Sequence, residues 1–331
     1  MHFAKPAPLA LAATLALAAF GAQAQSQVKV YGLVDLSVGS SQEIGVGKPV
    51  KSGVDSGKMT TSYYGLSGSE DLGGGLSGLF KLESFLRADN GEQGRFGGDA
   101  QFSRTASVGL AHKDYGQLTL GRNTTALFLS TLSFNAFGDS FGYSPSIRHY
   151  FTSGTVTGDT GWSDSIAYYS PKFGGLSFGA AAALKETSNG GNWSANVGYA
   201  AGPLSATVVM QEVKKDGASA VADTRTWQLA GNYALTDGLK LFAQYGQVDN
   251  LSTGADYRIS GAGVRAVMGL GAVLAQYGHV SADVGGNRNT FSLGYDHFLS
   301  KRTDLYAVMM SDKQAGKSSG SAYAVGMRHR F

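Results

Sequence analysis

The sequence predicts an all-β fold, a 16-stranded antiparallel transmembrane β-barrel with short periplasmic turns, long extracellular loops and a third loop folded into the lumen. Three observations support this prediction. Segments of about ten residues carry apolar or aromatic side chains at every second position, and the connections between these segments alternate in length. The chain also combines 48 glycines with 11% aromatic residues, which indicates many turns within folded β structure.

The first segment, residues 28–38, shows the alternation clearly. Val34 and Leu36 share one face of this segment, whereas Lys29 and Asp35 share the other. Hydrocarbon on one face and charge on the other suits a wall between lipid and water. Applied along the whole chain, this pattern predicts sixteen strands, at residues 28–38, 60–69, 76–85, 102–110, 116–122, 164–169, 176–184, 193–200, 204–212, 226–234, 239–248, 256–267, 271–280, 289–298, 303–310 and 321–331.

The connections between the predicted strands indicate the orientation of the barrel. Residues 113–115, 172–175, 201–203 and 236–238 are short connections, and those between them are longer. Outer-membrane barrels place short turns in the periplasm and long loops outside the cell. At sixteen strands, such a barrel encloses an aqueous channel rather than a core filled by side chains.

The N-terminal residues have the layout of a secretory signal peptide. His2 and Lys5 precede an apolar stretch, residues 9–20, that ends near Ala22-Gln23-Ala24. The alternative, a membrane anchor, needs about 20 apolar residues, and this stretch is shorter. We therefore expect a signal peptide at 1–24 that exports the chain and a mature barrel at 25–331.

A soluble propeller or double sandwich is the competing all-β architecture. Such folds turn hydrocarbon inward and charge outward. In the last predicted strand, Tyr323, Val325, Met327 and Phe331 share one face, and no later segment follows to cover the terminal ring. Lipid would cover it, which favours the membrane barrel.

Composition and motifs argue against several other classes of protein. The chain has no cysteine, and its formal net charge of +3 gives no support for nucleic-acid binding. The pattern Gly73-x-Gly75-x-x-Gly78 falls in a predicted hairpin turn, without the helix that a dinucleotide site requires. We expect no cofactor and no metal, because metal-ligand spacing is absent from the mature histidines 112, 149, 279, 297 and 329. We expect His297 and His329 to lie at the membrane interface.

The third long connection, from about Asn123 to Asp164, is the candidate constriction loop. We expect its first half, approximately 123–150, to enter the lumen, with Asp139 as its only acid and Arg148 towards its end. Packing inside a barrel would shelter the aromatic residues of this half, which are Phe128, Phe134, Phe137, Phe141 and Tyr143. The alternative is an outward loop that contacts other subunits or lipopolysaccharide.

Charged wall residues facing this loop would set ion selectivity, because a ring of charges in a narrow, low-dielectric passage acts on ions at short range. The candidates are Lys81, Glu83, Arg104 and Arg122, with Asp35 as a neighbour. The alternation of side chains along the strand supports an inward position for Lys81 and Glu83. Arg104 and Arg122 share parity with apolar residues, and we expect them to turn inward because they lie near strand ends. Three basic candidates against Glu83 and Asp139 favour a mild preference for anions.

The chain resembles the general porins of β-proteobacteria, a family that includes the neisserial porins. The resemblance spans the chain and rests on six motifs, Val30-Tyr31-Gly32-Leu33-Val34-Asp35, Gly68-Ser69-Glu70-Asp71-Leu72-Gly73-Gly74-Gly75-Leu76, Tyr115-Gly116-Gln117-Leu118-Thr119-Leu120-Gly121-Arg122, Ser165-Ile166-Ala167-Tyr168-Tyr169-Ser170-Pro171, Leu293-Gly294-Tyr295-Asp296-His297-Phe298-Leu299-Ser300-Lys301-Arg302-Thr303 and the terminal strand. One departure concerns selectivity: Tyr63 and Ser67 stand where relatives commonly carry basic residues.

The resemblance implies a homotrimer of barrels in the Gram-negative outer membrane, in contact with the lipid bilayer and lipopolysaccharide. Each barrel would be a passive, water-filled channel for ions and small hydrophilic solutes, narrowed by its third loop. Two other classes stay open. An outer-membrane barrel enzyme would need a nucleophile or acid/base set near one rim, and the sequence shows none. A substrate-specific channel would use the aromatic loop as a binding track for sugars or aromatic acids.

Overall fold

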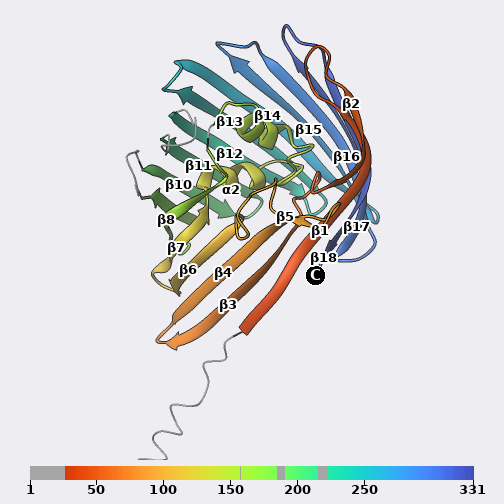
Figure 1. Ribbon diagram of the computed structural model, residues 1–331. Coiled ribbons are helices and arrows are strands. Elements are labelled where there is room, and N and C mark those ends of the chain that lie inside the picture. Colours follow the sequence, from red (N-terminus) through yellow and green to blue (C-terminus); the bar gives the residue numbers. More distant parts are fainter. Residues whose placement is uncertain (1–26, 157, 185–190, 215–222) are drawn as a thin grey trace, which may run out of the picture.

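The computed structural model describes residues 27–156, 158–184, 191–214 and 223–331, and these residues form a closed antiparallel β-barrel (Figure 1). The predicted signal peptide lies outside the described residues. The strands are β1 Gln27–Gln42, β2 Val50–Ser56, β3 Tyr63–Gly73, β4 Leu76–Arg87, β5 Glu92–Gln93, β6 Thr105–His112, β7 Gly116–Thr124, β8 Gly161–Tyr169, β9 Leu176–Ala183, β10 Asn192–Ala201, β11 Leu204–Val213, β12 Thr224–Thr236, β13 Leu239–Asn250, β14 Ala255–Met268, β15 Gly271–Ala282, β16 Arg288–Phe298, β17 Thr303–Gln314 and β18 Gly320–Arg330.

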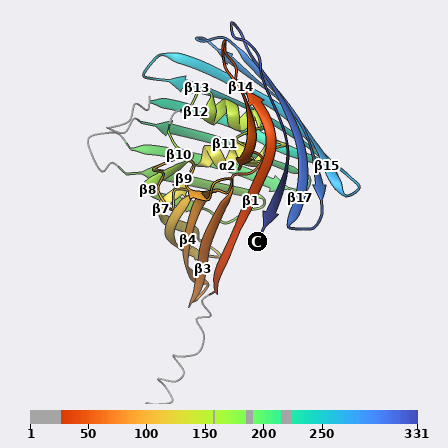
Figure 2. The same ribbon diagram turned by 45° about the vertical axis from the view of Figure 1, so that its right-hand side comes forward.

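These segments make sixteen wall strands, which confirms the predicted fold. β2 and β3 together form the second wall strand, because β2 pairs with the upper part of β1 and β3 with the lower part. β5 pairs with the end of β4 inside the second loop, residues 88–104, and adds no wall strand. β1 also pairs with β18, where Leu33 faces Arg330 and Gln42 faces Ser321. This pairing closes the barrel (Figure 2).

Several strand boundaries differ from the sequence prediction by up to four residues, for example those of β3, β6, β8 and β17, and one strand segment was missed. The first strand continues beyond Val38 to Gln42, and β2 was not predicted at all. Residues 50–56 contain only Val50 and Val54 as large apolar side chains, so the alternation there is too weak to recognise. The pairing of β2 with β1, rather than its own pattern, identifies it as a strand.

The outer surface carries the apolar side chains. Val30, Val108, Leu120 and Val325 are each at least half exposed, whereas Asp35, on the opposite face of β1, is 0% exposed. A soluble protein shows the reverse arrangement, and this distribution therefore excludes a soluble propeller or sandwich. No helix among the described residues is long and apolar enough to cross a membrane.

The tight turn between β3 and β4 contains three consecutive glycines. Gly73, Gly74 and Gly75 have φ angles of 82°, 62° and 85°. A residue with a Cβ atom rarely adopts this left-handed region, so the tight turn depends on glycine. The glycine pattern at this position therefore belongs to a turn between two strands, as predicted.

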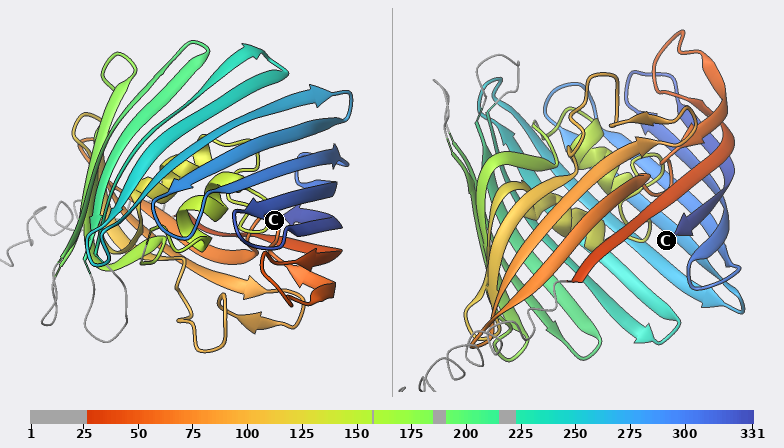
Figure 3. Two further views of the ribbon diagram at one scale, coloured as in Figure 1. Left: turned by 90° about the horizontal axis from the view of Figure 1, so that it is seen from above. Right: turned by 60° about the horizontal axis from the view of Figure 1, so that its bottom comes forward.

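The third loop, residues 125–160, folds into the lumen and contains α2 Ala126–Ser133, α3 Pro145–Ile147 and the π-helical turn η1 Arg148–Thr152. Seen from above, these helices lie inside the ring of strands (Figure 3). Thr125 caps α2 by accepting a hydrogen bond from the backbone N–H of Phe128 at 3.3 Å. Ser144 caps α3 in the same way, accepting from Ile147 at 3.2 Å.

Polar side chains of the β12 to β16 wall hold the third loop in place. Gln228 donates to the hydroxyl of Thr131 at 3.0 Å, and Gln276 accepts from the backbone N–H of Ala136 at 3.1 Å. At the far end of the loop, a ring nitrogen of His149 lies 2.8 Å from the Thr290 hydroxyl. The third loop is therefore attached to the wall along most of its length.

Glycines on the same wall allow this close approach. A Cβ atom at Gly278 would lie 2.8 Å from both His149 and Pro145, and one at Gly294 would lie 3.1 Å from the ring of Phe137. Contacts at about 2.8 Å are too short for a Cβ atom, so a larger residue at Gly278 would displace the loop.

Apolar packing completes the attachment. One buried cluster joins Phe137 and Tyr143 of the loop to Tyr306, Val308 and Met310 of β17. A second cluster joins the loop to the β11 to β15 wall through Leu127, Tyr150, Val156, Val209, Val248, Ile259 and Val280. Together the two clusters join the third loop to inward side chains of strands between β11 and β18. The alternative of an outward third loop is therefore wrong.

Candidate functional site

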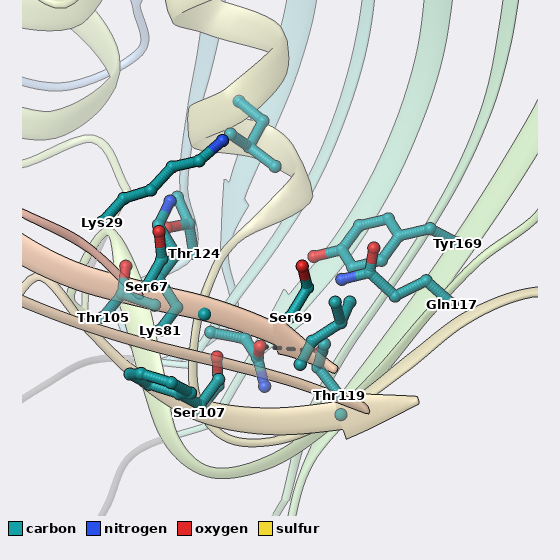
Figure 4. Close-up of a pocket in the computed structure, with 16 residues that line it drawn as sticks. Lys29, Ser67, Ser69, Lys81, Thr105, Ser107, Gln117, Thr119, Thr124 and Tyr169 are labelled. Carbon is teal, nitrogen blue, oxygen red and sulfur yellow. Dashed lines mark hydrogen bonds between the residues drawn. The ribbon is translucent and has the colours of Figure 1, made fainter. Parts of the chain in front are cut away.

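A cavity of about 480 Å³ lies between the third loop and the wall formed by β1, β3, β4 and β6 to β8 (Figure 4). It sits near the short turns, and we name it the turn-side cavity. Its charged lining residues are Lys29 and Lys81, and the other side chains labelled in Figure 4 are polar, namely Ser67, Ser69, Thr105, Ser107, Gln117, Thr119, Thr124 and Tyr169. Both charged residues of the lining are basic, and the nearest acid, Glu83, lies behind Lys81 and Thr105.

A second cavity, of about 360 Å³, lies on the side of the long loops, and we name it the loop-side cavity. Residues that are adjacent in the sequence line the two cavities. Arg104 and Phe128 line the loop-side cavity, while Thr105 and Leu129 line the turn-side cavity. Both cavities therefore follow the same wall, from the end of β4 and the start of β6 towards the turns.

Glu83 is the centre of the charged cluster between these cavities. Its carboxylate lies 3.0 Å from Lys81 Nζ and 3.2 Å from Arg104 Nε. It also accepts hydrogen bonds from the hydroxyls of Tyr31, at 2.8 Å, and Thr105, at 2.9 Å. Glu83 is only 3% exposed, whereas the side chain of Lys81 is 48% exposed. The acid is therefore shielded, and the bases present their charge to the lumen.

Arg104 lies just before β6, and its guanidinium is held between aromatic rings. Its Cζ atom lies 4.2 Å from the centre of the Tyr63 ring and 5.5 Å from that of Phe85. Such contacts favour a cation and fix the plane of the guanidinium. Arg104 therefore faces inward, as its position near a strand end suggests, and Tyr63 supports it.

Asp139 lies on the third loop and faces the same region. Burial raises the pKa of its carboxyl, and the positive charge of Arg104 opposes this rise. Among the described residues, Asp139 has no ion-pair partner within 4.0 Å. Its carboxyl lies close enough to Arg104, Arg328 and Arg330 for their positive charges to favour its ionised form.

Arg122 turns inward at an irregularity in the pairing of β7 with β8, and it binds a neighbouring loop end rather than the Lys81 cluster. Its guanidinium donates to the backbone oxygen of Gly161 at 3.1 Å and forms an ion pair with Asp159. Arg95 of the second loop binds the other side of Asp159 at 2.6 Å and binds Asp99 at 2.8 Å. These four side chains, Arg95, Asp99, Arg122 and Asp159, form a latch that ties the second loop to the end of the third.

Arg148 and Asp35 lie apart from the Lys81 cluster. Arg148 Nη2 is 3.3 Å from Oδ2 of Asp312, which also pairs with Arg288 on the β16 to β17 wall. The Asp35 carboxylate accepts hydrogen bonds from the backbone N–H groups of Met59 and Thr60, each at 2.8 Å, and from the Tyr306 hydroxyl at 2.7 Å. Asp35 is fully buried, and its role is to hold the wall between β2 and β3 rather than to line open water.

His297 and His329 lie on the outer face, the side shared by their apolar neighbours of the same parity. His329 is exposed on the outer face, where its ring lies 2.9 Å from the Thr303 hydroxyl, and His297 packs beside the outward Tyr295. His149 is the exception, because it is buried beneath the third loop and burial lowers its pKa to about 3. It is therefore a neutral packing residue.

Sequence reasoning missed three groups of residues in the lumen. The sequence placed Lys29 on the polar face of the first strand but did not assign it to the passage. It lies on the same inward face as Tyr31, which contacts Glu83. Arg95 and Asp159 lie in connections without regular alternation, and no pattern in the sequence joins them. The glutamines that hold the third loop, Gln228 and Gln276, share the inward face of their strands, but their partners become visible only in the folded chain.

A closed barrel with an apolar outer surface, a charged and water-accessible lumen and an internal loop defines a passive diffusion channel of the outer membrane. Comparison with known proteins agrees with this class. The family model described as Gram-negative porin matches residues 10–317. The chain belongs to this family.

Individual relatives cover nearly the whole chain. It is 30% identical to outer membrane porin protein 32 of Delftia acidovorans, over 97% of this chain and 99% of that one. It is 27% identical to an outer membrane porin protein of Bordetella pertussis, over 98% of this chain and 99% of that one. Among solved structures, it resembles the anion-selective porin from Comamonas acidovorans with a TM-score of 0.81 and 27% identity, covering 93% of this chain and 100% of that one.

Proposed function

We propose that this porin is a general diffusion channel with a mild preference for anions, and that charged wall residues opposite the third loop set this preference. The observation that carries the proposal is the charge along the passage. Five basic side chains and one acid line the two cavities, namely Lys29, Lys81, Arg87, Arg95, Arg104 and Asp159. The acid is bound by Arg95 and Arg122.

The arrangement of Glu83 supports the same sign of selectivity. A carboxylate that accepts four interactions inside the wall holds Lys81 and Arg104 in position, but its own charge is largely withdrawn from the passage. A permeating anion therefore meets ammonium and guanidinium groups at short range. The name of the Comamonas relative, an anion-selective porin, is in keeping with this assignment.

Single-channel recording in a planar bilayer tests the proposal. With unequal KCl concentrations on the two sides, the reversal potential should show chloride crossing more readily than potassium. Lys81→Glu should shift the reversal potential towards potassium, and Asp139→Lys should shift it further towards chloride. Lys172→Glu, on an exposed periplasmic turn, makes the same charge change outside the passage and should leave it unchanged. If Lys81→Glu and Asp139→Lys behave like Lys172→Glu, the assigned residues do not control selectivity.

The mature protein is further proposed to be a homotrimer that contacts lipopolysaccharide, exported by cleavage after Ala24 and without enzymatic activity. The resemblance to trimeric porins and the exposed apolar outer wall support the assembly. Light scattering of the detergent-purified protein should give the mass of three chains. N-terminal sequencing of the protein from membranes should begin at Gln25.

A further inference from the structure

The loop-side cavity has an aromatic lining that simple ion passage does not require. Phe85 of β4 and three phenylalanines of the third loop, Phe128, Phe141 and Phe151, face it. The ring of Phe128 lies 5.7 Å from that of Phe141 and 5.3 Å, edge to face, from that of Phe151. These separations are those of interacting aromatic side chains, and a further ring can pack against such a cluster.

One cation in this cavity has unused hydrogen-bond donors. Arg104 forms an ion pair with Glu83, with Nε 3.2 Å from Oε2 but without a hydrogen bond, and its two terminal nitrogens donate no hydrogen bond to the described residues. Arg95, by contrast, uses Nε and both terminal nitrogens to bind Asp99 and Asp159. Arg104 therefore provides a guanidinium that can bind a carboxylate in a bidentate manner.

Several other polar groups of the cavity are already engaged. The Ser56 hydroxyl donates to Ser62 at 3.1 Å, and the Ser62 hydroxyl donates to the backbone oxygen of Asp35 at 3.1 Å. Asp159 is bound by two arginines. A sugar, which needs several free donors and acceptors, would find few partners here, whereas a ring with one negative group would find phenylalanines and a free guanidinium.

We propose that the loop-side cavity is a binding site for small aromatic carboxylates, with the ring against Phe128, Phe141 and Phe151 and the carboxylate on Arg104. The cavity, of about 360 Å³, falls within the size range of small-molecule sites. This proposal rests on the proposed function, because the bound carboxylate lies on the route of permeating anions. It adds a preference for one chemical class of anion.

Benzoate titration of single channels in KCl tests the site. Benzoate should reduce the chloride current with a saturating dependence on concentration. Acetate, which has the charge without the ring, and benzyl alcohol, which has the ring without the charge, should not produce saturation. Arg104→Gln should abolish the saturating block by benzoate.

Two aromatic substitutions and a matched control make the test specific. Phe141→Leu and Phe151→Leu should each raise the half-saturating benzoate concentration by about five-fold, as the loss of one aromatic contact implies. Phe173→Leu removes an exposed ring on a periplasmic turn and should match the parent protein. Circular dichroism verifies that each variant retains its β-sheet structure.

The possible outcomes separate this proposal from the proposed function. Equal saturation by acetate would show a site that recognises charge alone, and equal saturation by benzyl alcohol would show that Arg104 takes no part. A linear benzoate response, or phenylalanine variants that match Phe173→Leu, would also overturn the site. Each of these results leaves the reversal potential in KCl unaffected, whereas failure of the proposed function appears in that potential without benzoate.

Discussion

Arg104 Nε lies 3.2 Å from Oε2 of Glu83, and this ion pair crosses from the start of β6 to β4. Glu83 thereby fixes Arg104, which lines the loop-side cavity, and among the described residues it is the only acid in an ion pair with Lys81. Removing the negative charge of Glu83 should therefore shift the ion selectivity in a predictable direction.

Glu83→Gln should increase the preference for anions. The substitution keeps the size of the side chain but leaves Lys81 and Arg104 without a counter-charge, so the passage gains one net positive charge. The reversal potential in a KCl gradient should shift towards that of chloride. Asp114→Asn removes an acid from an exposed periplasmic turn and serves as the control. A shift towards potassium would contradict the assigned geometry.

The latch between the second and third loops should open only in acid. Burial alone would raise the pKa of Asp99 and of Asp159, but hydrogen bonds from Arg95 outweigh burial and lower both values. A carboxyl with a lowered pKa contributes stability above its unfolded pKa of about 4, and this contribution is lost as the pH falls further. Proteolysis of the second loop should thus stay constant from neutral pH to about pH 4 and increase below it.

Asp159→Asn should loosen the same latch at neutral pH, because the two arginines lose their shared negative partner. We expect faster proteolysis of the second loop and larger current fluctuations than in the parent protein. Asp89→Asn changes an exposed acid of the same loop and is the matched control. Equal proteolysis of the two variants would show that Asp159 does not hold the second loop.

Gly278→Val should displace the third loop from the wall. Its Cβ atom would lie 2.8 Å from His149 and Pro145, too close for either to stay in place. Overpacking of this kind costs about 1–3 kcal/mol of folding free energy. Single-channel conductance should change and thermal stability should fall. Gly53→Ala adds its methyl group to open space and should do neither.

Deleting Phe331 should weaken barrel closure. Its backbone exchanges two hydrogen bonds with Gly32, at 3.2 and 3.1 Å, beside the last pairs of β1 with β18. Their loss should cost about 2 kcal/mol of folding free energy, which a thermal melt in detergent would detect. Phe331→Leu keeps both hydrogen bonds and should be affected less. Equal melting temperatures for the deletion and the parent protein would contradict this role.

The fold was accessible from the sequence because alternation is a local property of each strand. Sixteen wall strands and their order follow from it, and so does the inward direction of Lys81 and Glu83. The strand β2 was not predicted because its pairing with β1, rather than its composition, makes it part of the wall. Local pattern also placed Asp35 on the inner face correctly.

The surroundings of the inward residues could not be predicted in the same way. Asp35 is sealed by Tyr306, which lies 271 residues further along the chain. Arg122 and Arg148 were grouped with Lys81 by charge and loop position, but their partners, Asp159 and Asp312, come from segments that only folding brings together. Tertiary contacts therefore decide which inward charges meet water.

The interruption between β2 and β3 has a mechanical consequence. The backbone oxygen of Lys58, within this interruption, accepts hydrogen bonds from Gly142 N–H at 3.0 Å and from the Ser140 hydroxyl at 2.7 Å. The third loop is thus hydrogen-bonded to the wall at two places, at Lys58 between β2 and β3 and along β12 to β16. The loop separates the wall against which its apolar side chains pack, β11 to β18, from the wall that the turn-side and loop-side cavities follow, β1 to β8. Substitutions of lining residues on β1 to β8 therefore change the charge of the passage, whereas substitutions beneath the third loop, such as Gly278→Val, change the position of the loop itself.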